Sequence, residues 1–209
     1  MSTEPTEPAE PSDIELLEAW RANDAAAGQA LFKRHFRKIY RFFETKFGKD
    51  VDELVQATFL ACVRAKNQFR GDSSFTTYLF TIARHELYRA LTARRRDLDR
   101  IDFEVSSVAE LAQTPRTRIA AQEDRVRLLH ALRELPVEQQ VLLELHYWEG
   151  LDAAALGEVF EMPPGTMRSR LSRAREALRE IMLKDAETPR EVTESVESLD
   201  AWARKLAAQ

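Results

Sequence analysis

Apolar side chains recur every three or four residues along most of this chain, and polar or charged residues fill the positions between them. That spacing is typical of helices with one buried face. It predicts helices over residues 13–22, 25–48, 51–68 and 74–95, followed by a second helical stretch over residues 123–183. Long runs of Ala, Leu, Glu and Arg and the near absence of β-branched runs favour an all-α fold.

The expected ends of these helices are marked by residues that commonly cap helices. Short polar side chains accept hydrogen bonds from the free N–H groups at a helix start, and glycine readily ends a helix. On this basis the expected end residues are Ser12 or Asp13, Gly48, Asp50 with Glu53 as an acidic capping box, and Ser73 or Ser74. The second stretch is divided at Pro136, at Gly150 and at Pro163, Pro164 and Gly165.

The pattern predicts two small helical domains joined by a linker, with an amphipathic helix at the C-terminus. The expected parts are a disordered acidic tail (1–12), a first domain (13–98), a linker (99–122), a second domain (123–183) and an extension (184–209). In the extension, apolar residues from Val192 to Leu206 repeat at helical spacing. That helix needs a surface to cover, so it either packs on the second domain or regulates the protein.

The segment DAAALGEVFEMPPGTMRSRLSRAREAL predicts a helix-turn-helix, with Asp152 as a cap and Gly157 where a close helix crossing needs a small residue. The expected core face of its second helix is formed by Met167, Leu171, Ala174 and Leu178. The opposite arc holds Arg168, Ser169, Ser172 and Arg173, with Arg170 and Arg175 beside it. Arginine and serine can bind base edges and phosphates in a major groove. The alternative is an ordinary surface helix kept soluble by its arginines.

The stretch RGDSSFTTYLFTIARHELYRALTARRR, residues 70–96, interleaves aromatic rings with arginines. At 100° per residue, Phe75, Leu79 and Ile82 fall on one apolar face, and Phe80, Leu87 and Leu91 on an adjoining one. The remaining arc contains Tyr78, Thr81, Arg84, His85, Tyr88 and Arg89. We call it the strand-facing arc, where strand means an unpaired nucleic-acid strand. Rings beside arginines suit unpaired bases on a charged backbone. Alternatively, the two tyrosines shield a neighbouring helix.

The charge distribution favours a polyanionic partner for the first domain. Residues 31–100 carry sixteen basic and eight acidic side chains, although the whole chain has a net charge of −4. A solvated basic surface is the simpler alternative. No apolar run reaches the roughly 20 residues that cross a bilayer, and the acidic, Pro-rich start does not resemble a signal peptide, so we expect a cytoplasmic protein without membrane insertion.

The residues do not indicate an enzyme or a cofactor. His35, His85, His130 and His146 stand far apart, without metal-ligand spacing, and there is no Gly-rich phosphate loop. The single cysteine, Cys62, lies among apolar helix positions and is expected to be buried. We therefore expect no catalytic, metal or cofactor site.

Two blocks of the sequence resemble the sigma-70 family of RNA polymerase factors. DELVQATFLACVRAKNQFRGDSSFTTYLFTIARHELYRALTARRR resembles region 2, and LRELPVEQQVLLELHYWEGLDAAALGEVFEMPPGTMRSRLSRAREAL resembles region 4. The short linker between the two makes the chain similar to the extracytoplasmic-function (ECF, group IV) subfamily. The first domain would then be region 2, and the second domain would be region 4.

The resemblance implies a sigma factor that binds core RNA polymerase and directs transcription initiation at promoters. Region 2 would dock on the β′ clamp helices through Asp52, Glu53, Gln56, Leu60 and Asn67, and region 4 would meet the β flap. Region 2 would melt the minus-ten element, with the loop FRGDSS capturing a flipped base. The implied minus-ten residues are Arg70, Asp72 and Ser73 together with the strand-facing arc. The implied minus-thirty-five residues are Thr166, Arg168, Ser169, Arg170, Ser172 and Arg173.

Two further expectations concern a regulatory partner and an alternative function. The subfamily is commonly held inactive by an anti-sigma factor, which is a third candidate partner beside polymerase and promoter DNA. The main alternative function is a stand-alone helix-turn-helix regulator, which would account for residues 123–183 but not for the aromatic and basic unit at residues 50–96.

Overall fold

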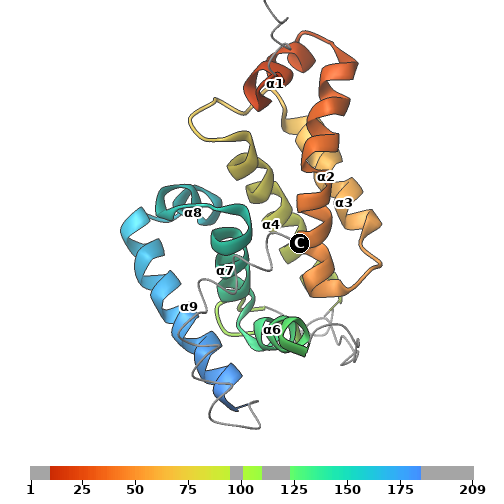
Figure 1. The fold of residues 1–209 in the computed structure, drawn as a ribbon. Helices are drawn as coiled ribbons and strands as arrows, with labels where there is room; N and C mark the ends of the chain where they lie inside the picture. Colours follow the sequence, from red (N-terminus) through yellow and green to blue (C-terminus); the bar gives the residue numbers. More distant parts are fainter. Residues whose placement is uncertain (1–9, 95–100, 110–122, 185–209) are drawn as a thin grey trace, which may run out of the picture.

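The computed structural model describes residues 10–94, 101–109 and 123–184, and these residues form eight α-helices (Figure 1). The first group comprises α1 (Asp13–Arg21), α2 (Ala25–Phe47), α3 (Asp52–Ala65) and α4 (Phe75–Arg94). The second group comprises α6 (Glu123–Glu134), α7 (Val137–Glu149), α8 (Ala153–Phe160) and α9 (Pro164–Lys184). The described residues contain no strand beyond an isolated bridge between Ser107 and Pro136, so the predicted all-α fold is confirmed. Most of the expected acidic tail and linker, and nearly all of the C-terminal extension, lie outside the described residues.

Most of the predicted helix ends are confirmed. The Ser12 hydroxyl accepts a hydrogen bond from the Glu15 N–H at 3.3 Å, and the Glu15 carboxylate accepts one from the Ser12 N–H at 2.7 Å, which completes a capping box. Gly48 ends α2 with φ of 81°, a conformation that favours glycine. The Ser74 hydroxyl accepts from the Thr77 N–H at 3.0 Å at the start of α4.

The predicted start of α3, at about residue 51, is confirmed to within one residue, but its predicted cap and its predicted end were wrong. Its N-cap is Val51, and no side chain caps it, so the capping box of Asp50 and Glu53 does not form. The helix ends at Ala65 rather than at residue 68. The carbonyls at this end are bound by other helices: the Arg21 guanidinium of α1 donates to the Lys66 carbonyl at 2.7 and 2.9 Å, and the Tyr78 hydroxyl of α4 donates to the Ala65 carbonyl at 2.9 Å. These tertiary contacts cap the helix earlier than its sequence indicates.

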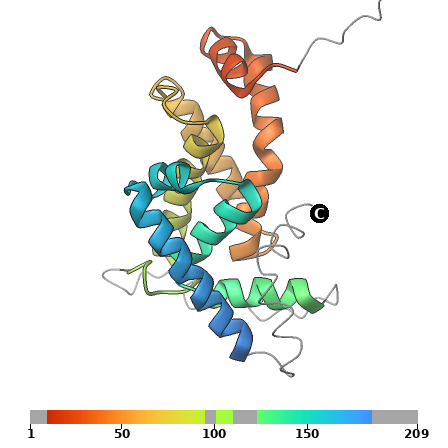
Figure 2. The same cartoon turned by 60° about the vertical axis from the view of Figure 1, so that its left-hand side comes forward.

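The two helical groups pack directly against each other. Helix α8 packs against α4, and in both views α6 lies near the C-terminal end of α2 (Figures 1 and 2). Buried apolar side chains form one continuous core that includes Phe43 and Phe80 from the first group and Leu143 and Val159 from the second. The sequence predicts the two groups, but its helical periodicity does not reveal this contact between them.

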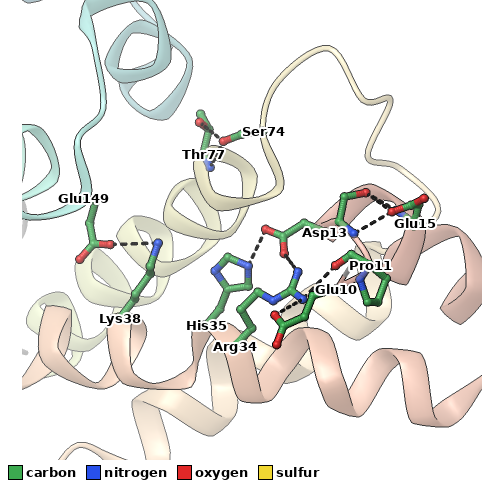
Figure 3. A network of polar contacts seen from close by, with 11 residues as sticks. Glu10, Pro11, Asp13, Glu15, Arg34, His35, Lys38, Ser74, Thr77 and Glu149 are labelled. Atoms are coloured by element: carbon green, nitrogen blue, oxygen red, sulfur yellow. Dashed lines mark hydrogen bonds and ion pairs between the residues drawn. The ribbon is translucent and has the colours of Figure 1, made fainter. Parts of the chain in front are cut away.

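A polar network, in which His35 is buried, joins α1 to α2 (Figure 3). The Asp13 carboxylate lies 2.7 Å from the His35 Nε2 atom and accepts a hydrogen bond from Arg34 at 2.7 Å. Burial lowers the pKa of His35, and although Asp13 opposes this shift, the pKa remains below its ordinary value. Burial acts to raise the pKa of Asp13, but the Arg34 hydrogen bond and the His35 pairing outweigh it, so this pKa is also lowered.

These two shifts predict loss of stability in mild acid. Because the pKa of folded His35 is lowered, the unfolded chain takes up that proton first, and stability falls as the pH drops below roughly 6.5. The Asp13 contribution is lost at still lower pH, as the pH falls through its lowered pKa. We expect the melting temperature to fall by a few degrees between pH 7.5 and 5.5. His35→Gln, which has no titrating ring, should flatten this profile, and parallel profiles for the two proteins would contradict the assignment.

Candidate nucleic-acid interface

The helix-turn-helix predicted from the sequence is formed by α8, a tight turn and α9. The Asp152 carboxylate caps α8 by accepting from the N–H groups of Ala154 and Ala155 at 3.0 and 2.9 Å. At its other end, Glu161 adopts a left-handed conformation with φ of 57°, and the Met162 N–H donates to the Gly157 carbonyl at 2.8 Å. A Cβ atom on Gly157 would lie 2.6 Å from the Met162 carbonyl oxygen. The expected need for a small residue is therefore confirmed, but the predicted reason was wrong: the close contact is with the turn and not with a crossing helix.

The two faces of α9 have the predicted character. Met167, Leu171, Ala174 and Leu178 are all buried. Arg168, Ser169, Ser172 and Arg173 are all exposed; we call these four residues the reading face. Thr166 is half-buried and accepts a hydrogen bond from the Ser169 hydroxyl at its carbonyl, 2.9 Å away. The first turns of α9 thus offer two arginines and two hydroxyls to solvent, the side-chain set that suits a major groove.

Two arginines beside the reading face, Arg170 and Arg175, form hydrogen bonds to other side chains of the same chain. The Arg170 guanidinium donates to Glu138 at 2.6 Å and to Glu104 at 2.8 Å, and the Glu104 hydrogen bond in particular raises the pKa of Arg170. Arg175 donates to the Tyr147 hydroxyl at 2.6 Å. In this arrangement Arg170, predicted as a minus-thirty-five residue, is engaged with two glutamates that the sequence did not connect to it.

The predicted apolar faces of α4 are buried, apart from the half-buried Ile82. On the strand-facing arc, Tyr78 packs its ring 4.9 Å from that of Phe69, and its hydroxyl binds the end of α3. Thr81 is half-buried, and its hydroxyl donates to the Thr77 carbonyl at 3.0 Å. For Tyr78, the ring therefore packs on the loop before α4 and the hydroxyl binds the end of α3, an arrangement closer to the alternative noted from the sequence, in which the tyrosine shields a neighbouring helix.

The second helical group covers the middle of the strand-facing arc. The Arg84 guanidinium donates to the Val159 carbonyl of α8 and lies 5.1 Å from the ring centroids of both Tyr88 and Phe160. Tyr88 stacks on Phe103 with centroids 4.2 Å apart, and burial raises its pKa. Arg84 and Tyr88 are therefore not free to meet a nucleic acid in this arrangement.

The rest of the predicted minus-ten set is accessible. Arg70, Asp72, His85 and Arg89 are exposed, and Ser73 is half-buried. His85 lies 3.5 Å from Glu161 at the end of α8, with both side chains more than half exposed. The loop before α4 and one edge of the helix are therefore at the surface, whereas Arg84 is buried.

The surface of α3 is open to solvent at all five predicted polymerase-binding positions, namely Asp52, Glu53, Gln56, Leu60 and Asn67. Asn67 lies in the turn after α3 rather than on its helical arc, because the helix ends at Ala65. An apolar groove between α2 and α3 extends this surface and is lined in part by Phe32, Phe36, Phe59, Leu60 and Val63. The exposed Phe36 and Val63 were missed in the sequence, although large apolar residues on a polar helix face are a usable signal.

Among the residues that the structure describes, no group of three His, Cys, Asp or Glu side chains could hold a metal ion. Cys62 is buried as predicted, and burial raises the pKa of its thiol to about 12. None of the helices in this part of the chain is long and apolar enough to span a membrane.

Comparison with known families matches both helical groups. Residues 31–97 match the family description "Sigma-70 region 2", and residues 125–178 match "Sigma-70, region 4". The ECF RNA polymerase sigma-E factors of Salmonella typhimurium (strain LT2) and Escherichia coli (strain K12) are each 30% identical over 176 residues, which cover 80% of this chain and 92% of the relative. The chain therefore belongs to the ECF sigma factors of the sigma-70 family, a family of transcription-initiation factors.

Solved structures share the same fold. The sigma factor RpoE of Bartonella quintana, solved with the anti-sigma factor NepR, matches 76% of this chain and 98% of its own chain, with a TM-score of 0.58 and 24% identity. CnrH, solved with the cytosolic domain of CnrY, matches 84% of this chain and 99% of its own, with a TM-score of 0.62 and 21% identity. Both likenesses support a fold of two helical domains.

Proposed function

We propose that this chain is a sigma subunit that binds core RNA polymerase, recognises minus-thirty-five and minus-ten promoter elements and helps to open the DNA. The observation that carries the proposal is the reading face of α9, which is exposed on a helix whose opposite face is buried in a complete helix-turn-helix. Region 4 would read the upstream element as duplex through this face. Region 2 would act at the minus-ten element through the loop at residues 70–74 and the strand-facing arc.

The polymerase contact is assigned to the exposed surface of α3 and the adjoining apolar groove. Its acidic residues Asp52 and Glu53 stand beside exposed Leu60 and Phe36, so the surface offers both charge and apolar area to a partner. Buried apolar area with a polar rim is the usual composition of a protein interface. An anti-sigma factor, as bound by RpoE in its solved structure, is a further candidate partner. Because core polymerase and promoter DNA are its proposed partners, we expect the protein to act in the cytoplasm.

Arg173→Ala should weaken binding to upstream promoter duplex about 5–150-fold if the guanidinium contacts a base, because a good base contact contributes about 1–3 kcal/mol. Among the described residues, its Nε donates to the Ser169 carbonyl within its own helix, at 3.4 Å. Fluorescence anisotropy on several upstream sequences at one salt concentration measures the change. Arg179→Ala, an exposed arginine near the end of the same helix, is the matched control. Equal affinities of the Arg173→Ala and unmodified proteins on every sequence would remove Arg173 from the reading face.

Association with core polymerase distinguishes a sigma factor from a stand-alone helix-turn-helix regulator. The full chain should co-elute with core RNA polymerase on gel filtration. Separate elution, combined with retention of duplex DNA, would favour the stand-alone helix-turn-helix regulator and leave the α3 surface without a role.

A further inference from the structure

The apolar groove between α2 and α3 is exposed in the part of the chain that the structure describes. The two helices lie side by side (Figure 1), and the rings of Phe32 and Phe59 in the groove have centroids 4.7 Å apart. Phe36 and Leu60 are each 47% exposed, and Val63 is 40% exposed. Adjacent large apolar side chains that stay exposed in this way mark a binding surface.

The C-terminal extension carries an apolar stripe of matching length in its sequence. Counted at 100° per residue, an arc of about 80° holds Val192, Val196, Leu199, Ala203 and Leu206. As a helix, residues 192–206 would be about 22 Å long, close to the roughly 21 Å of the 14-residue α3. A helix with such a stripe needs an apolar surface to cover.

The charges of the extension and the groove are also complementary. The α2 side of the groove carries the exposed Lys33 and Arg37. Residues 184–209 contain six acidic and four basic side chains, a net charge of −2, and all six acidic side chains precede residue 201. The bases Arg204 and Lys205 follow them, and the exposed Asp52 at the start of α3 offers these two the opposite charge.

The extension begins beside the second helical group but is long enough to leave it. Helix α9 ends at Lys184. In both views the C-terminal half of α9 lies beside α6, and α6 lies near the C-terminal end of α2 (Figures 1 and 2). The seven residues 185–191 can extend over up to about 25 Å, which carries the apolar stripe past α6 toward α2 and α3.

We propose that residues 192–206 dock as a helix in the groove between α2 and α3, so that the chain covers its own polymerase-binding surface when polymerase is absent. The docking stands on the groove and the stripe, whereas the competition with polymerase rests on the proposed function. A tethered segment has an effective concentration of about 1 mM, so an intrinsic dissociation constant of about 0.1 mM would weaken polymerase binding about tenfold.

Chemical cross-linking of the full chain tests the docking. In the double variant Gln56→Cys with Asp200→Cys, one cysteine lies near the middle of the groove and the other near the middle of the stripe, so the two should be close whichever way the segment runs. A short bismaleimide should join them within one chain, as mass spectrometry of the digested protein would show. Cys62 should stay unlabelled because it is buried and burial raises the pKa of its thiol to about 12.

The same chemistry identifies other occupants of the groove. The double variant Glu176→Cys with Asp200→Cys has its first cysteine on the exposed side of α9. A cross-link there and none at position 56 would show that the extension packs on the second helical group, and this would overturn the proposal. A mixture of the single variants Gln56→Cys and Asp200→Cys should give no cross-linked dimer. A dimer would place the extension of a second copy in the groove and would also overturn docking within one chain.

Polymerase binding tests the competition. Val196→Asp with Leu199→Asp places two charges on the stripe, and Thr193→Asp with Ser198→Asp places the same two charges away from it as a matched control. Titration of the fluorescently labelled chains with core polymerase should show about tenfold tighter binding for the first variant than for the unmodified chain, and no change for the control. Equal affinities of all three proteins would overturn the competition. If none of the three binds core, the sigma-factor assignment fails, and the cross-linking still decides whether the extension occupies the groove.

Discussion

Replacing Lys46 with methionine should lower the free energy of unfolding by about 3–5 kcal/mol, the usual effect of removing one partner of a buried ion pair. The carboxylate of Glu144 would be left fully buried, and among the described residues the Gln140 side chain, 2.8 Å away, would still donate to it. Burial lowers the pKa of Lys46, and the paired Glu144 opposes that shift. The lysine is therefore tolerated in this core because of its partner.

The double variant Lys46→Met with Glu144→Leu should recover most of the lost stability, because it replaces both charges by apolar side chains of similar size. Urea unfolding of the unmodified protein, both single variants and the double variant gives the coupling free energy between the two positions. A loss below about 1 kcal/mol in Lys46→Met, with no recovery in the double variant, would show that the pair is not buried in solution.

Gly157→Ala should destabilise the second helical group by about 1–3 kcal/mol, although alanine is the better helix former by about 1 kcal/mol. The added Cβ would lie 2.6 Å from the Met162 carbonyl oxygen, and that carbonyl belongs to the turn that orients α9. The turn must shift to relieve this contact. We therefore expect a lower melting temperature and weaker duplex binding together.

Gly165→Ala is the matched control for Gly157→Ala. A Cβ atom there would meet nothing closer than the Arg168 guanidinium at 3.8 Å, so this variant should keep or slightly raise the stability of the protein. Thermal unfolding followed by circular dichroism compares the two variants. If Gly157→Ala is as stable as Gly165→Ala, the close approach at the helix-turn-helix does not exist as described.

Local sequence signals predicted the elements that depend on local forces. The caps at Ser12, Asp152 and Ser74 and the buried face of α9 follow from residues within a few positions of each other, and the structure confirms them. The end of α3 could not be predicted in this way. Its last carbonyls are bound by Arg21 and Tyr78, which lie on other helices.

In the candidate site, too, features set by nearby residues were predicted and features set by contacts between helical groups were not. The reading face was predicted because one helix carries both its buried and its exposed side. The burial of Arg84 was not predicted, because it depends on how a second helical group docks. The sequence did contain a signal at Lys46. This residue follows the buried positions His35, Ile39 and Phe42 at helical spacing, which predicts that it is buried too. A buried charged side chain needs a charged or hydrogen-bonding partner.

The sigma-factor assignment is tested most directly by transcription in vitro by core RNA polymerase on fragments of genomic DNA, with and without this chain, followed by mapping of transcript starts. A sigma factor should give discrete new start sites that need the full chain, each preceded by shared minus-ten and minus-thirty-five sequences. If core polymerase starts at the same places with and without the chain, the assignment is wrong.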